Sequence, residues 1–193
     1  ARAIRPFMAD AVPGWCDACI SLCDASGKEL SYVDDFHLKA DPVLIRQISK
    51  DGEYVVTIRD ILYRGRGNFV YRLKIGALPY ITHVFPLGAA RGSTARIELN
   101  GVNLPKKTLE LAIAADSPPV QEIQVHRDGI MSNKATFAVH DAPEVREAEP
   151  NDSLKEAARV SVPTLVNGRI DKPGDVDYFV FHTKASQKLV LEV

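Results

Sequence analysis

Short runs in which hydrophobic and polar residues alternate recur along the chain and predict an all-β fold. The clearest runs are residues 53–59, 69–75, 93–99 and 134–140. Their β-branched and aromatic content favours sheets, and in 69–75 the alternation predicts that the odd-numbered positions face inward. Further strands are expected at residues 1–7, 19–24, 29–33, 78–86, 109–115, 120–126 and 187–193, and a short helix at 154–158.

Turn sequences separate these runs. Asp24-Ala25-Ser26-Gly27, Asn100-Gly101 and Asp128-Gly129 combine residues that favour turns with a glycine that tolerates positive φ. Residues 77–142 differ in pattern from residues 1–76 before them and 143–193 after them.

Composition and charge exclude some function classes. Of the 193 residues, 46% are hydrophobic and 25% charged, an ordinary globular balance. The net charge is −1 and no basic block is present, so the sequence predicts no nucleic-acid partner. No apolar run approaches the ~20 residues of a membrane helix, so no membrane insertion is expected. The chain starts without Met inside an expected strand, and we expect it to be part of a longer protein.

Three cysteines lie close together at Cys16, Cys19 and Cys23. The C-x2-C-x3-C spacing has no fourth cysteine to complete a zinc or iron–sulfur site. In a strand, Cys19 and Cys23 share one face, and cysteine often behaves as a small buried hydrophobe, which is the favoured interpretation. A disulfide from Cys16 to either of the others stays open in an exported protein.

Two acidic clusters flank a short apolar segment near the end of the chain. All their members offer oxygen ligands, the type that Ca²⁺ prefers, although solvated turn residues are an alternative interpretation. The candidate metal ligands are Glu147, Glu149, Asn151, Asp152, Asp171, Asp175 and Asp177.

The same region carries a family resemblance. Glu-Pro-Asn-Asp, Gly-Arg-Ile-Asp and Asp-Val-Asp-Tyr-Phe, within 149–179, resemble the start of a bacterial pre-peptidase C-terminal (PPC) domain. Motifs in 1–76, such as Asp-Gly-Glu-Tyr-Val-Val, resemble its second half. The resemblance implies a jelly-roll β-sandwich of the kind attached to secreted proteases, similar in fold to clostridial collagenase collagen-binding domains. It also implies Ca²⁺ binding by a Glu-x-Glu-x-Asn-Asp segment, here 147–152, and two later aspartates.

Residues 77–142 carry a different resemblance. Pro-x-Ile-x-x-Val-x-Pro, Gly-Ser-Thr and Leu-Asn-Gly-Val-Asn-Leu resemble an IPT/TIG domain, which implies a small immunoglobulin-like β-sandwich. The flanking part-modules have 76 and 51 residues, 127 in all, about one whole PPC sandwich. We expect them to close on each other, with strand 187–193 near 1–7 or 53–59, because half a sandwich exposes apolar surface and unpaired edges. The alternative is that they belong to successive copies in a tandem array.

No catalytic motif is present around the five histidines, and no nucleophile elbow or phosphate-binding loop occurs. Together with this, the two resemblances imply a non-catalytic accessory region of a secreted, periplasmic or cell-surface bacterial protein. Its expected partners are other domains of the same parent protein, and an extracellular protein or polysaccharide contacted by exposed aromatics such as Tyr32, Tyr63 or Tyr178. For Tyr178, which lies in an alternating run, a buried core position is the favoured interpretation. Ca²⁺ would rigidify the linker 147–152. The alternatives are a structural repeat without ligand and a fragment of a secreted hydrolase.

Overall fold

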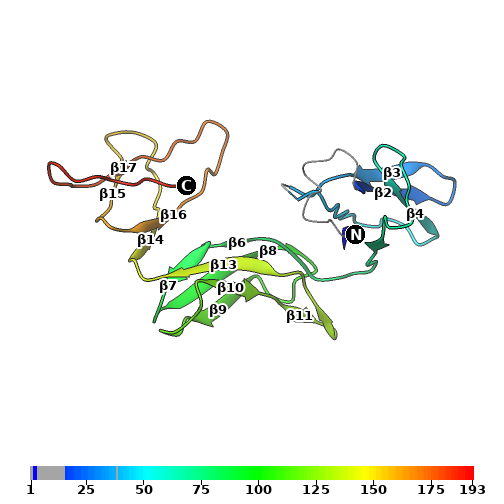
Figure 1. The fold of residues 1–193 in the computed structure, drawn as a ribbon, viewed down its shortest axis with the longest axis horizontal. Coiled ribbons are helices and arrows are strands. Elements are labelled where there is room, and N and C mark those ends of the chain that lie inside the picture. Colours follow the sequence, from blue (N-terminus) through cyan, green and yellow to red (C-terminus); the bar gives the residue numbers. More distant parts are fainter. Residues whose placement is uncertain (1, 4–15, 38) are drawn as a thin grey trace. The chain divides into compact units, whose positions relative to one another are not determined.

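The fold is all-β, as the hydrophobic pattern predicts (Figure 1). A computed structural model describes residues 2–3, 16–37 and 39–193, and these form strands, turns and loops but no helix. Accordingly, this part of the chain offers no helix that could span a membrane. The chain divides into two compact units, residues 1–76 and 77–193.

The first unit is built around a three-stranded antiparallel sheet in the order β3-β2-β4. Its central strand is apolar on both faces: Ala18, Cys19, Ile20 and Leu22 are buried, which explains why β2 lies between two partners. A two-stranded sheet joins β1 to β5. The strands are β1 Arg2–Ala3, β2 Ala18–Asp24, β3 Glu29–Val33, β4 Tyr54–Asp60 and β5 Tyr71–Arg72.

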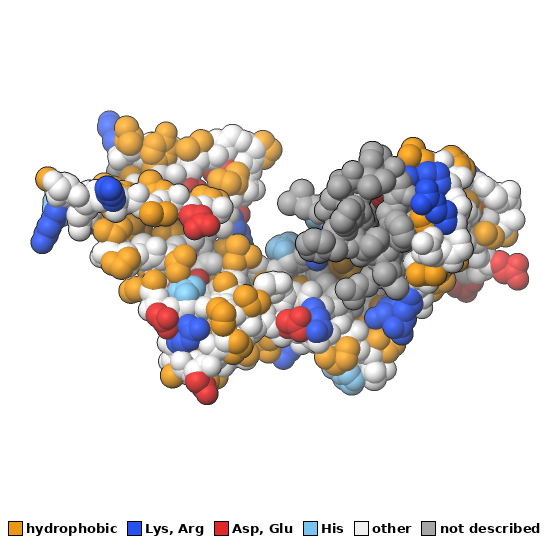
Figure 2. Space-filling view, in the orientation of Figure 1, with side chains coloured by type: hydrophobic (Ala, Val, Ile, Leu, Met, Phe, Trp, Pro, Cys, Tyr) orange, Lys and Arg blue, Asp and Glu red, His pale blue; other side chains and the backbone are white. Residues whose placement is uncertain are grey.

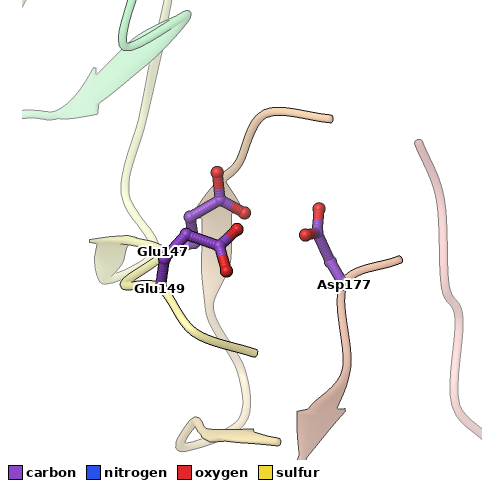
Figure 3. A group of neighbouring side chains, drawn as sticks. All are labelled: Glu147, Glu149 and Asp177. Atoms are coloured by element: carbon purple, nitrogen blue, oxygen red, sulfur yellow. The ribbon is translucent and has the colours of Figure 1, made fainter. Parts of the chain in front are cut away.

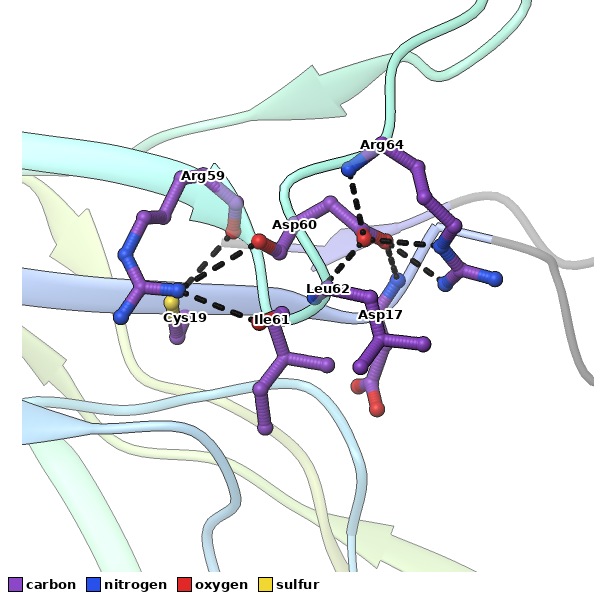
Figure 4. A network of polar contacts seen from close by, with 7 residues as sticks. All are labelled: Asp17, Cys19, Arg59, Asp60, Ile61, Leu62 and Arg64. Atoms are coloured by element: carbon purple, nitrogen blue, oxygen red, sulfur yellow. Dashed lines mark hydrogen bonds and ion pairs between the residues drawn. The ribbon is translucent and has the colours of Figure 1, made fainter.

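A buried carboxylate fixes the chain where β4 ends (Figure 4). Asp60 accepts hydrogen bonds from the backbone N–H groups of Asp17, Leu62 and Arg64, at 3.0, 3.0 and 3.2 Å. It also accepts two from the Arg64 guanidinium, each at 2.9 Å. These donors, the guanidinium first, lower the pKa of Asp60 far below its usual range. The network holds Tyr63 at φ 57°, a conformation that bulky residues seldom adopt.

The second unit begins with a sandwich of two three-stranded sheets, β6-β8-β9 and β10-β13-β7. Phe137 and Ile97, both fully buried, lie in one core cluster with Ile81, Val84 and Val139, so both sheets contribute to it. We call residues 77–142 the sandwich. Its strands are β6 Tyr80–Phe85, β7 Gly88–Ala90, β8 Thr94–Val102, β9 Thr108–Ala112, β10 Val120–Ile123, β11 His126–Arg127, β12 Ile130–Met131 and β13 Ala135–His140.

Residues 143–193 contain only short strands in two parallel pairs, β14 with β16 and β15 with β17. The strands are β14 Glu144–Arg146, β15 Ala158–Arg159, β16 Leu165–Asn167 and β17 Phe179–Val180. Large apolar side chains stay exposed here, including Leu154, Ile170 and Val190, and Figure 2 shows hydrophobic side chains at the surface over this segment.

Several local predictions are wrong. Residues 154–158 form a turn and the start of β15 instead of a helix. Asn100-Gly101 is part of β8 and makes no tight turn. A Cβ at position 101 would lie 2.0 Å from the Tyr80 carbonyl oxygen, so glycine here permits the close approach of β6.

The run 69–75 forms only the two-residue strand β5, and Tyr71 and Ile75, expected to face inward, are exposed. Of the expected strand 1–7, Arg2–Ala3 forms β1 and the remaining positions lie outside the described residues.

The expected closure of the two part-modules has no support in the strand pairing. Residues 187–193 form no strand, and β4, which contains most of 53–59, pairs with β2. Among the described residues, every strand of 1–76 pairs within that range. Residues 187–193 have no partner strand among the described residues, and their alternating pattern alone does not produce a β-strand.

Candidate metal centre

Two parallel strand pairs bring distant carboxylates together. Glu147 follows β14, and its N–H donates to the carbonyl of Asn167 at the end of β16, 2.9 Å away. Asp177 precedes β17, and the N–H of the next residue, Tyr178, donates to the Asn151 carbonyl at 3.0 Å. The backbone therefore places residues 147–151 beside both 167 and 177.

The centre consists of the carboxylates of Glu147, Glu149 and Asp177 (Figure 3). One oxygen from each lies within 4.8 Å of the other two. Asp177 is half-buried, as is Glu147, and Glu149 is exposed. Three negative groups at this separation repel one another, so the arrangement favours a bound cation.

Asn151 lies beside these carboxylates and is fully buried. Its backbone N–H donates to Glu149 Oε2 at 3.0 Å. With the nitrogen of its amide facing the carboxylates, Asn151 donates to Asp177 Oδ1 at 3.2 Å and to Glu149 Oε2 at 3.3 Å. The buried amide therefore holds two of the three carboxylates in place and contributes no side-chain oxygen to the centre.

The carboxylate of Glu147 is tightly enclosed. Its Oε1 accepts a hydrogen bond from the backbone N–H of Arg169, whereas its buried Oε2 has no hydrogen-bond donor. A Cβ at position 168 would lie 2.5 Å from Oε2, so only glycine leaves room for this carboxylate. Burial, assisted by the charges of Asp177 and Glu149, raises the pKa of Glu147 above its ordinary value.

The remaining candidates form a second, separate acidic group. Asp175 is buried and accepts a hydrogen bond from the Asp171 N–H at 2.6 Å, which lowers the pKa of Asp175. Lys172 Nζ lies 3.5 Å from Asp152 and 3.8 Å from Asp175. Asp171 contributes its backbone, and its side chain is exposed. The Lys172 ammonium thus already offsets part of the negative charge of this group.

The first centre fits the requirements of Ca²⁺. Ca²⁺–oxygen bonds are about 2.3–2.6 Å long, so two oxygens on opposite sides of one ion are about 4.6–5.2 Å apart. The three carboxylate oxygens lie within 4.8 Å of one another, so one such ion can contact all of them. Three carboxylates give an all-oxygen set, which hard cations prefer over softer metals.

The other sequence candidates lie elsewhere. Cys19 and Cys23 are free thiols, and Cys19 is buried in β2, in agreement with the buried-hydrophobe interpretation; Cys16 is partly buried. His37, the histidine that follows the acidic pair Asp34-Asp35 in the sequence, is exposed in a loop, in contact with the ring of Phe36. Tyr32 and Tyr63 are exposed, and both lie against the guanidinium of Arg59.

Sequence reasoning missed three residues at this site. Gly168 and Arg169 shape and bind the Glu147 carboxylate, and Lys172 occupies the second acidic group. Their only signal is position, since Gly168-Arg169 lies in the Gly-Arg-Ile-Asp motif and Lys172 follows Asp171.

No protein-family model, curated protein or solved structure matches the chain.

Proposed function

We propose that this chain is a non-catalytic accessory region of an exported bacterial protein, stabilised by Ca²⁺ held at Glu147, Glu149 and Asp177. The observation that carries the proposal is the meeting of these three carboxylates, whose oxygens lie within 4.8 Å of one another, with the buried Glu147 Oε2 left without a hydrogen-bond donor. A divalent cation would offset most of the negative charge that they bring together.

The role we propose is targeting or positioning of the parent protein. The centre joins residues 147–151 to the chain around Asp177, and an ion bound to both would stiffen the connection between the sandwich and the segment that follows it. The partners are other domains of the parent protein and an extracellular protein or polysaccharide. The PPC and IPT/TIG resemblances support this role, and so does the lack of a catalytic motif in the sequence.

Unfolding measurements with and without Ca²⁺ test the metal. An ion that binds only the folded state stabilises it by about 2.7 kcal/mol at a concentration of 100 times Kd. We expect a higher unfolding temperature in millimolar Ca²⁺ than in chelator, and loss of that difference in Glu149→Gln.

Glu156→Gln is a matched control, since Glu156 is exposed and its carboxylate contacts Ser153 outside the centre. An unfolding temperature that is the same in Ca²⁺ and in chelator would refute the proposed Ca²⁺ site. It would favour the alternative, a structural spacer without ligand.

A further inference from the structure

A three-residue segment contacts both the candidate metal centre and the sandwich. The carbonyl of Asn167 accepts a hydrogen bond from the Glu147 N–H at 2.9 Å. Its side-chain oxygen accepts one from the N–H of Leu87, in the sandwich, at 2.8 Å, and its amide nitrogen donates to Glu144. Residues 167–169 therefore link the two sites through hydrogen bonds on both sides.

Arg169 also contacts both the candidate metal centre and the sandwich. Its backbone N–H donates to Glu147 Oε1, whereas its guanidinium pairs with Glu98 of β8 at 2.5 Å. The guanidinium also lies over the ring of Phe85, 3.7 Å from the ring centre. The hydrogen bond from Arg169 lowers the pKa of Glu98, which keeps the pair charged near neutral pH.

A second arginine approaches the same ring from the other strand of the pair. Arg146, immediately before Glu147, has its guanidinium 5.4 Å from the centre of the Phe85 ring and 3.7 Å from Glu98. It also donates to the Arg96 carbonyl at 2.5 Å. Both backbone elements that hold the Glu147 carboxylate are thus anchored on one patch of the sandwich, formed by Phe85 and Glu98.

We propose that docking of the sandwich onto Arg146 and Arg169 regulates cation binding at Glu147, with Arg169 as the positioning residue. The inference rests on the proposed Ca²⁺ site. When Arg169 holds Glu98 and Phe85, its N–H holds Glu147 Oε1 and so fixes this carboxylate at the centre. Such coupling is reciprocal, so a bound cation stabilises the docked sandwich by the same factor by which docking tightens cation binding.

Calcium titration calorimetry on the full chain and its variants tests the coupling. Arg169→Gln removes the ion pair and the ring contact but retains the N–H that binds Glu147. Because the Arg169–Glu98 pair is partly exposed, the effect is modest, and we expect about 3- to 10-fold weaker Ca²⁺ binding. Glu98→Gln, which alters only the sandwich, gives a loss of similar size, and the double variant loses little more than either single one.

Arg159→Gln is the matched control, because Arg159 is exposed in β15 and forms no ion pair among the described residues. Arg159→Gln removes one positive charge, as Arg169→Gln does, and should change the Ca²⁺ affinity by less than twofold. Arg169→Lys retains the charge and is expected to give an intermediate affinity, which separates coupling from a folding defect.

The outcomes distinguish the two proposals. A wild-type chain that binds no Ca²⁺ removes the proposed function and this inference together. A wild-type chain that binds Ca²⁺, with Arg169→Gln and Glu98→Gln of unchanged affinity, overturns the coupling alone.

Discussion

Gly168→Ala should weaken Ca²⁺ binding while leaving the stability of the metal-free fold unchanged. A methyl group at this position would lie 2.5 Å from Glu147 Oε2 and 3.1 Å from its Cδ, with no backbone atom among its near contacts. The atom that must move is the end of a flexible side chain. The backbone can therefore stay in place while the carboxylate is displaced.

The displacement is large on the scale of metal coordination. Oε2 must retreat by about 0.9 Å to reach the 3.4 Å at which ordinary van der Waals contact begins. Ca²⁺–oxygen bonds vary by only about 0.3 Å, so Glu147 loses its place as a ligand. Changes next to metal ligands typically reduce affinity by about 10- to 100-fold, and we expect a loss in that range.

Calorimetric Ca²⁺ titration and thermal unfolding in chelator, on the same samples, provide the assay. We expect weakened binding with an unfolding temperature in chelator close to that of wild type. Gly65→Ala is the control, since a Cβ there meets nothing within 4 Å. Unchanged affinity in Gly168→Ala, in a chain whose wild type binds Ca²⁺, would show that Glu147 is not a ligand.

Two further predictions concern the fold. Asp60→Asn removes a buried negative charge that accepts five hydrogen bonds. We expect the free energy of unfolding, measured with denaturant, to fall by about 3 kcal/mol. The exposed control Asp51→Asn should lower it by less than about 0.5 kcal/mol. The pKa of Asp60 is lower in the folded state than its ordinary value of 3.8, so the ionised carboxylate contributes its full stability above that pH and less as the pH falls further. The unfolding free energies of wild type and Asp60→Asn should therefore become equal in acid. Phe137→Ala, at a fully buried position of β13, should cost about 3–5 kcal/mol of sandwich stability, and a loss below 1 kcal/mol contradicts the assigned core.

The strands that could be predicted from sequence are those that bury one or both faces within their own sheet or core. β2, β3, β4, β6, β8, β9 and β13 all lie where alternation or turn signals place them, because each packs within its own sheet or core. The runs 69–75 and 187–193 carry equally clear patterns but form little or no strand. A pattern marks the face that can be buried, whereas a strand also requires a neighbouring edge to pair with.

The candidate centre was predictable in part. Alternation before Pro150 places Glu147, Glu149 and Asn151 on one side of the chain, and the structure brings Asp177 to them through β17. Sequence could not assign Asp152, Asp171 and Asp175 to a separate group, because that depends on where Lys172 lies in space. Nor could it find Arg169, whose partners Phe85 and Glu98 are more than 70 residues away.

Amide hydrogen exchange in residues 188–193 would reveal any partner strand that pairs with them. Residues 188–193 lie outside every sheet of the described chain, and Val190 and Leu191 are more than 80% exposed. Their amide hydrogens should therefore exchange with deuterated solvent within seconds. If a neighbouring module or another copy adds a strand there, exchange in these six residues slows by orders of magnitude, and the protected alternate amides identify the register of the contact.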